Sequence, residues 1–171
     1  MNSASNPVRV TLQIAAKAAE LPSAKQFELW VNSAVNSGGR PVTDNSRITV
    51  RIVEEAESGA LNGQYRHSAR PTNVLAFPAG DDEYVHGDDV EPEIGDLVIC
   101  AAVVEREAQE QSKSVAAHFA HMTVHGSLHL LGYDHTTEKE AAEMEGLEKQ
   151  VLGMLGFPDP YRDDNQDLKQ A

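Results

Sequence analysis

The sequence predicts an α+β fold in which helices pack on a small mixed β-sheet. Apolar and polar residues alternate in the N-terminal part of the chain, as half-buried strands require, whereas helical spacing dominates the C-terminal part. With 171 residues, 40% of them hydrophobic, the chain is long enough to bury one core. We therefore expect one domain over residues 1–158, followed by a polar tail over residues 159–171.

The N-terminal half is predicted to alternate strands with helices. Val8, Val10, Leu12 and Ile14 lie at every second position, which is typical of a strand with one buried face. The expected elements are a strand over 7–15, a helix that Ser23 caps and that ends at Gly38-Gly39 and Pro41, a strand over 47–53, a short helix over 54–61 that stops near Asn62-Gly63, and a strand over 73–77.

The C-terminal half is predicted to be mostly helical. After an acidic stretch over 79–92, which we interpret as a surface loop, we expect a strand over 94–101 and helical segments over 103–111 and 115–131, interrupted near Ser112. Thr137 and Glu140 form a capping-box pattern that starts the last helix. That helix carries Met144, Leu147, Val151 and Leu155 on one face and ends at Gly156 and Pro158.

Composition excludes several classes of protein. The single cysteine, Cys100, excludes an internal disulfide and a multi-cysteine zinc site. No apolar run approaches the ~18 residues of a membrane span, and the N-terminus lacks the pattern of a signal peptide. We therefore expect a cytoplasmic protein with no membrane partner.

The net charge of −13 argues against nucleic acid as a partner, but its distribution weakens that argument. Residues 1–70 hold eight Lys/Arg and six Asp/Glu, a net charge of +2, whereas residues 71–171 have a net charge of −15. Because the acidic residues are segregated, the average charge says little about one local groove.

Five of the seven histidines are clustered between residues 118 and 135. On a helix, His125 and His129 are i, i+4 neighbours with Cβ atoms about 5–6 Å apart, so both imidazoles can reach one cation. Gly132 allows the chain to leave the helix, and His135 can then return as a third ligand. Three protein ligands leave the fourth position of a zinc ion open, as in catalytic sites. We therefore predict one Zn²⁺ held by His125, His129 and His135.

The remaining two clustered histidines, His118 and His121, share the face of His125. A fourth protein ligand would close the metal site, so we expect them to support the ligands or to pack in the core.

The spacing H-x-x-x-H-x-x-G-x-x-H makes this a zincin-like metal-site helix, but one residue differs from the zincin proteases. Those enzymes carry a glutamate as general base directly after the first histidine, where this chain has Gly126. The difference argues against peptide hydrolysis. A glycine inside a helix costs about 1 kcal/mol relative to alanine, and we interpret Gly126 as leaving room for a bulky group beside the metal.

The segment from His125 to His135 resembles the signature of the YbeY family, bacterial rRNA maturation factors and metal-dependent endoribonucleases. Further stretches resemble the family in the same order: residues 61–66 (LNGQYR), 71–78 (PTNVLAFP), 95–100 (GDLVIC), 105–111 (EREAQEQ) and 117–121 (AHFAH). The resemblance covers residues 8–161, nearly the whole chain.

The resemblance implies a single-strand-specific endoribonuclease in the maturation of ribosomal RNA, at the 3′ end of the small-subunit RNA, and in ribosome quality control. It implies ribosomal RNA and the small ribosomal subunit or its proteins as partners, with no DNA. It also implies a functional arginine before the P-T-N-V-L stretch, which maps best onto Arg66. The family usually has serine where this chain has Ala76, and residues 67–69 replace a more charged stretch, so Arg70 stays an alternative to Arg66.

Two routes of RNA cleavage fit these residues. Water activated by zinc near neutral pH could attack phosphorus, or it could deprotonate a ribose 2′-OH for internal attack. Either route builds negative charge on phosphate oxygens, which the guanidinium of Arg66 can bind. Asp134 could orient a ligand imidazole or assist proton transfer, or it could be only a turn residue.

A second function remains open from the sequence. The protein could be a ribosome-associated assembly factor whose zinc is largely structural and whose nuclease activity is weak or indirect. Its acidity favours this alternative, because an acidic protein can reach RNA through basic ribosomal proteins.

Overall fold

The computed structural model describes residues 8–18, 20–40, 42–80 and 92–162. Four strands in these ranges form one mixed sheet with the order β1-β2-β4-β3. β1 (Val8–Ala15), β2 (Ser46–Val53) and β4 (Glu93–Cys100) run parallel, and β3 (Val74–Pro78) runs antiparallel to β4. The predicted mixed sheet is therefore confirmed, with β1 and β3 as its edges.

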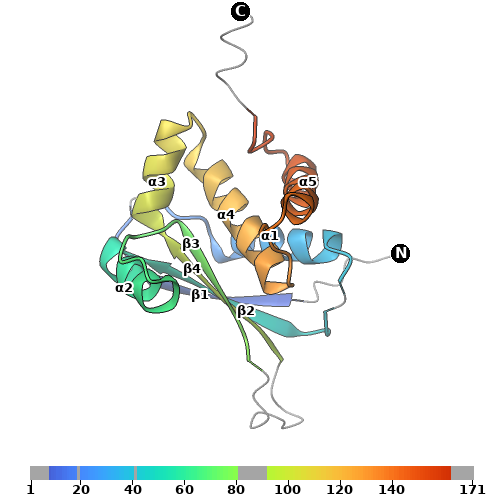
Figure 1. Ribbon diagram of the computed structural model, residues 1–171, viewed down its shortest axis with the longest axis horizontal. Helices are drawn as coiled ribbons and strands as arrows, with labels where there is room; N and C mark the ends of the chain where they lie inside the picture. The colour runs from blue at the N-terminus through green and yellow to red at the C-terminus, as the bar shows by residue number, and fades with distance from the viewer. Residues whose placement is uncertain (1–7, 19, 41, 81–91, 163–171) are drawn as a thin grey trace, which may run out of the picture.

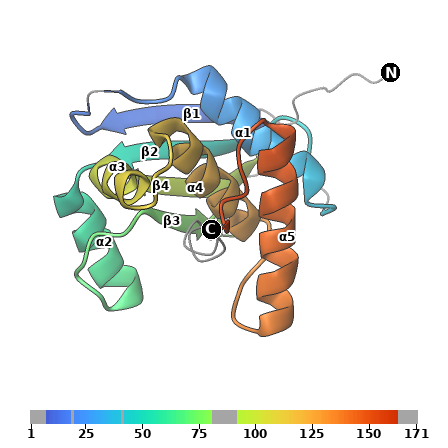
Figure 2. The same cartoon turned by 90° about the horizontal axis from the view of Figure 1, so that it is seen from above.

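The helices are divided between the two faces of the sheet (Figures 1 and 2). α1 (Ala24–Ser37) and α4 (Val115–Leu130) cover one face, and α5 (Glu138–Met154) packs on both of them. α3 (Ala101–Glu110) follows β4 directly and packs on α4. α2 (Glu55–Arg66) lies on the opposite face, where it packs against β4. This arrangement confirms the predicted α+β fold.

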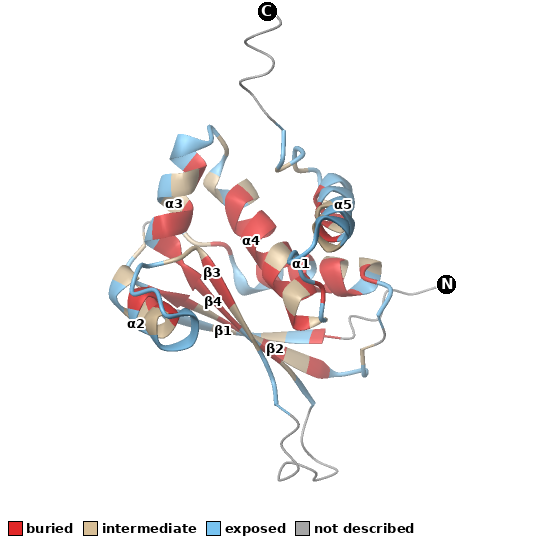
Figure 3. Ribbon diagram, viewed as in Figure 1, coloured by how far each residue is buried: buried red, intermediate tan, exposed pale blue. Residues whose placement is uncertain are grey.

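Two apolar clusters hold these layers together (Figure 3). The larger lies between the sheet and α1, α4 and α5, and includes Phe27, Ile48, Leu97, Phe119 and Val151. The smaller lies under α2 and consists of Val53, Leu75, Val98, Cys100 and Val103, with Leu61 and Phe77 at its border. Because β-strand side chains alternate between faces, each strand of the central pair contributes to both clusters.

The caps predicted for two helices are present. The Ser23 hydroxyl accepts a hydrogen bond from the N–H of Gln26, whose side chain accepts one from the Ser23 N–H. The Thr137 hydroxyl accepts the N–H of Glu140 and donates to the Glu140 carboxylate. These bonds satisfy N–H groups that the first turn of a helix leaves unpaired.

The predicted end of α2 near Asn62-Gly63 is wrong, because the helix continues to Arg66. Asn62 is buried inside the helix, and its side-chain amide donates to the carbonyl of Arg70 in the following loop. A Cβ at Gly63 would lie 3.5 Å from Ala69, which is an ordinary contact, so this position does not require glycine. Neither residue ends the helix, and Asn62 instead holds the loop that follows it.

Several expectations fall on residues outside the described ranges. The acidic stretch over 79–92 lies mostly there, as do residues 163–171 of the expected tail. Residues 159–162 are described and form a turn in which the Arg162 N–H donates to the Asp159 carbonyl. In the described part of the chain, no helix combines the length and apolar character needed to cross a membrane.

Candidate metal centre

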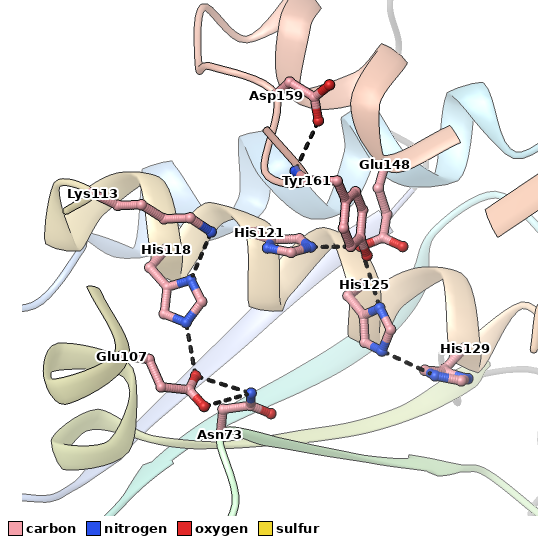
Figure 4. A network of polar contacts seen from close by, with 10 residues as sticks. All are labelled: Asn73, Glu107, Lys113, His118, His121, His125, His129, Glu148, Asp159 and Tyr161. Atoms are coloured by element: carbon pink, nitrogen blue, oxygen red, sulfur yellow. Dashed lines mark hydrogen bonds and ion pairs between the residues drawn. The ribbon is translucent and has the colours of Figure 1, made fainter. Parts of the chain in front are cut away.

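Helix α4 presents four histidines along one side (Figure 4). The helix starts at Ser114, whose hydroxyl accepts the N–H of Ala117, and it packs on β3 and β4. His118 and His121 are buried, whereas His125 and His129 are half-buried. The polar row therefore starts inside the protein and becomes accessible toward the C-terminal end of the helix.

Gly132 turns the chain at the end of α4, as predicted. Its φ of +98° lies in the left-handed region that favours glycine. The Gly132 N–H donates to the His129 carbonyl at 2.9 Å, and the Tyr133 N–H donates to the Leu128 carbonyl at 3.1 Å. These bonds satisfy carbonyls at the helix end and direct the following residues, including His135, back toward the helix.

The turn is also fixed to the end of α1. Nη1 of Arg40 donates to the Leu131 carbonyl at 2.9 Å, and its guanidinium lies 3.9 Å from the centre of the Tyr133 ring. The Tyr133 hydroxyl donates to the carbonyl of Gly38. The position of His135 is thus set by contacts that span the chain from α1 to the loop after α4.

The structure brings His125, His129 and His135 together. One ring nitrogen from each lies within 4.8 Å of those of the others. Nε2 of His125 and Nε2 of His129 are 3.1 Å apart, close to the roughly 3.3 Å that a tetrahedral zinc with N–Zn bonds of ~2.05 Å requires. His135 is exposed, so the cluster is open on its side. The donor set fits a divalent cation such as zinc with one position left for water or substrate.

Glu148 on α5 supports this cluster, and sequence analysis missed it. Its Oε1 lies 2.6 Å from Nε2 of His121 and 3.3 Å from Nδ1 of His125, and only 1% of its side chain is exposed. A carboxylate on the other ring nitrogen fixes the tautomer and orientation of a metal-binding histidine. With Nδ1 of His125 facing Glu148, its Nε2 is the nitrogen turned toward His129 (Figure 4).

The electrostatics keep Glu148 ionised and His121 neutral. Burial alone would raise the pKa of Glu148, but its hydrogen bonds with His121 and His125 outweigh burial and hold it at about 2. Burial lowers the pKa of His121 against the opposing effect of Glu148. A neutral His121 that donates Nε2–H to the carboxylate satisfies both conditions.

Tyr161 adds a third contact to the same carboxylate oxygen. Its hydroxyl donates to Oε1 of Glu148 at 2.9 Å, and its ring packs edge-on against His121 with centres 5.4 Å apart. Burial, together with the adjacent charge of Glu148, raises the pKa of Tyr161, so the phenol stays a donor. Tyr161 follows α5, within the segment expected to be a polar tail.

His118 belongs to a separate network at the buried end of the row (Figure 4). Its Nε2 lies 2.8 Å from Oε1 of Glu107 on α3, and that carboxylate also accepts from the side-chain amide of Asn73, which precedes β3. Nζ of Lys113 lies 3.4 Å from the other ring nitrogen. Burial lowers the pKa of both His118 and Lys113. The network links α3, α4 and the residue before β3, so His118 packs these elements together, which is the second of the two roles expected for it.

Gly126 has a different role from the one expected. A Cβ there would lie 2.7 Å from Cδ2 of Leu97 and 3.3 Å from Cγ2 of Val74, so this residue faces the sheet. The missing side chain allows α4 to approach β4 and β3 closely. The expectation that it leaves room for a bulky group beside the metal is wrong.

Arg66, Arg70 and Asp134 lie outside the histidine cluster. Arg66 is the exposed last residue of α2, on the sheet face opposite α4, and Arg70 is exposed in the following loop. Asp134 is exposed, and its Oδ1 accepts the backbone N–H of His135 at 2.8 Å. Burial and the neighbouring histidines lower the pKa of His129, and the charge of Asp134 opposes this shift. Asp134 therefore holds the backbone of the third histidine and lies near the second.

Comparison with known proteins agrees with this architecture. The solution structure of the protein TM1509 from Thermotoga maritima matches with a TM-score of 0.51 and 24% sequence identity, over 90% of this chain and 100% of that one. At this identity the likeness shows the fold alone. Residues 12–156, which include all three clustered histidines, match the family model described as endoribonuclease YbeY. The chain belongs to the endoribonuclease YbeY family.

Proposed function

We propose that this protein is a zinc-dependent endoribonuclease that cleaves single-stranded stretches of ribosomal RNA. We assign it to maturation of the 3′ end of the small-subunit RNA and to ribosome quality control in the cytoplasm. One observation supports the proposal most: a chain of the endoribonuclease YbeY family brings three histidines together with an open side. In this proposal residues 1–158 form the single metal-dependent hydrolase domain, and the partners are ribosomal RNA and the small subunit or its proteins, with no DNA or membrane.

His125, His129 and His135 would hold one zinc ion per chain. When bound, the ion supplies a Lewis acid that activates water near neutral pH and polarises a phosphate oxygen. The chain's own residues prepare this site before the ion binds. Glu148 orients His125 through Nδ1, and the Gly132 turn directs His135 toward the helix. Burial keeps the His129 imidazole neutral, as a ligand must be.

Arg66 would bind the phosphate whose negative charge grows during cleavage, because a guanidinium makes paired hydrogen bonds to phosphate oxygens. Asp134 would accept or return a proton at its carboxylate beside His135. Both roles are compatible with attack by water and with attack by the ribose 2′-OH.

The alternative, a ribosome-associated assembly factor with a largely structural zinc, is favoured by the net charge of −13. Such a charge opposes direct approach to RNA and favours basic ribosomal proteins. In that case the three histidines would stabilise the loop after α4, and RNA cleavage would be slow or indirect.

The deciding experiment compares metal-loaded wild type with the His125→Ala variant on purified ribosomal RNA, with zinc content measured for both. We expect cleavage by wild type, and loss of both cleavage and zinc in the variant. Equal cleavage by both proteins would contradict the proposal. Zinc binding without any cleavage by wild type would favour the assembly factor.

A further inference from the structure

One exposed segment carries basic residues and no acidic ones. The chain has 27 Asp and Glu, yet none lies between Glu57 and Asp81. The same stretch carries Arg66, His67 and Arg70, all exposed. A polyanion that approaches a protein of net charge −13 meets the least repulsion at such a segment. We call residues 65–70, which are the last two residues of α2 and the loop that follows it, the basic loop.

The basic loop is exposed, yet polar contacts fix the backbone at its end and just after it. The buried amide of Asn62 donates to the Arg70 carbonyl at 2.7 Å. The buried hydroxyl of Ser58 donates to the Thr72 carbonyl at 3.1 Å and accepts the Thr72 N–H at 2.9 Å. A loop held in this way loses little conformational freedom when it binds a ligand, so its exposed side chains are preorganised.

Tyr65 begins this loop and has the exposure of a binding residue. It is 57% exposed, although an aromatic ring gains more stability from burial. One contact orients it: its ring packs against Phe77 with centres 4.9 Å apart and planes at 63°. An exposed ring fixed by one aromatic neighbour provides a face on which an unpaired base can stack.

Helix α4, which carries the histidines, lies over β3, the edge strand that contains Phe77. Gly126 of α4 packs on Val74 of β3, and Leu130 packs on Gly95 of β4, the residue paired with the last position of β3. The helical turn that carries the metal-binding histidines is therefore above the β3–β4 pair. No other described strand pairs with the outer side of β3.

Tyr65 lies across the same strand from the metal centre. Val74 belongs to the apolar cluster under α4, whereas Phe77 borders the cluster under α2, so the two side chains point to opposite faces of β3. Tyr65 contacts Phe77 on that second face, and α2 lies on the side of the molecule where β3 forms the edge (Figure 2). A single strand of RNA that crosses the β3 edge can meet both the ring of Tyr65 and the three histidines.

We propose that Tyr65 binds an unpaired nucleobase of single-stranded RNA by stacking, while Arg66 and Arg70 bind the adjacent phosphates. This subsite rests on the proposed endoribonuclease function and deepens it, because it gives a physical reason for a preference for single strands. A base in a duplex is stacked on its neighbours and cannot lie on the ring. The subsite binds any base, since every base has a π-face.

The test measures binding separately from cleavage. Fluorescence anisotropy follows the full-length, zinc-loaded protein with a 2′-O-methyl oligoadenylate, and with an abasic oligomer of the same backbone, at low ionic strength. Tyr65→Ala and Tyr65→Leu remove the aromatic face, and the leucine keeps apolar contact with Phe77 so that the variant folds. Tyr65→Phe keeps the face. Leu29→Ala is the matched control, because Leu29 is 56% exposed on α1.

We expect Tyr65→Ala and Tyr65→Leu to weaken oligoadenylate binding about tenfold and to leave binding of the abasic oligomer unchanged. Tyr65→Phe and Leu29→Ala should bind both probes as wild type does. For RNA cleavage, the leucine variant should raise KM and keep kcat. Unchanged oligoadenylate binding in the leucine variant would overturn the proposal, as would an equal loss on both probes. Loss of ribosome binding alone would also overturn it and would assign Tyr65 to a protein contact.

The failure of the proposed function gives a different result. If wild type binds oligoadenylate through Tyr65 but cleaves no RNA, the proposed endoribonuclease function is wrong and the proposed stacking subsite stands. If wild type cleaves RNA and the leucine variant does so with the same KM, only the subsite is wrong.

Discussion

Glu148 and His125 are joined across α5 and α4 by a contact of 3.3 Å between Oε1 and Nδ1. The same oxygen lies 2.6 Å from His121 and receives the hydroxyl of Tyr161 at 2.9 Å. One buried carboxylate therefore connects a histidine of the candidate metal centre with a buried histidine and with the segment after α5. The orientation of His125 in this candidate centre depends on how α5 docks on α4.

Removal of the charge of Glu148 should weaken zinc binding. We expect Glu148→Gln to lower zinc affinity 10- to 100-fold, because it loses the negative partner that orients His125 and raises its basicity. Competition with a chromophoric chelator measures the affinity without any RNA. Glu143→Gln, an exposed site on the same helix, is the control and should bind zinc as wild type does. Equal affinities for all three proteins would contradict the role of Glu148.

Histidines at the buried end and at the accessible end of the row on α4 should differ in their effect on zinc content. His129→Ala should lose most of the bound zinc, because it removes one of three ligands. His121→Ala should retain most of the bound zinc, because Nε2 of His121 contacts Glu148 and His121 is not one of the three expected ligands. Elemental analysis of the purified proteins compares them. Full zinc content in His129→Ala would refute the ligand assignment, and complete loss in His121→Ala would make His121 a ligand.

The phosphate role of Arg66 should be separable from folding. Because Arg66 is exposed at the end of α2, Arg66→Ala should leave zinc content and the thermal unfolding midpoint nearly unchanged. Cleavage of RNA should fall tenfold or more, since one charge-assisted hydrogen bond contributes about 1.5–3 kcal/mol. Arg70→Ala is the paired variant in the same assay. If it abolishes cleavage while Arg66→Ala does not, the functional arginine is Arg70.

Acid should destabilise the fold in two steps. Burial lowers the pKa of His118 and His121 below 6.5 in the folded protein, so protonation favours unfolding as pH falls below 6.5. The folded pKa of Glu148 is about 2 against 4.5 when unfolded, so its contribution is present above pH 4.5 and is lost between pH 4.5 and 2. Urea unfolding at a series of pH values should show this decline. Glu148→Gln should lose its part of the slope below pH 4.5, and an unchanged slope would contradict the assignment.

Local sequence patterns predicted the elements that depend on local rules. The alternation in β1, the Ser23 cap and the turn at Gly132 follow from short-range geometry, and the structure contains all three. The three clustered histidines also lie within eleven residues of one another, so spacing alone could bring them together. Patterns of this length follow from backbone geometry within one element and its turn, so they can be interpreted without knowing any distant contact.

What the sequence did not predict depends on contacts between distant segments. Glu148 contacts a histidine 23 residues away, and Asn62 stabilises the loop that begins after its own helix. A signal for Glu148 existed: it is four residues after Met144 and three before Val151, so a charged residue interrupts the apolar face of α5. A charge at such a position indicates a buried partner.

Gly126 provides the clearest case in which tertiary packing outweighs helix propensity. An exposed helical glycine replaced by alanine gains about 1 kcal/mol, and Gly146→Ala on α5 should show that gain because nothing lies within 4 Å of its Cβ position. Gly126→Ala should instead lower the free energy of unfolding by about 1–3 kcal/mol, because the new methyl group would lie 2.7 Å from Leu97. Chemical unfolding of both variants beside wild type gives the two signs. The shift of α4 away from the sheet should also move His125 and weaken zinc binding, whereas Gly146→Ala should leave it unchanged. Stabilisation by Gly126→Ala would mean that α4 does not need this close approach to the sheet, and the interpretation of Gly126 as a packing residue would fail.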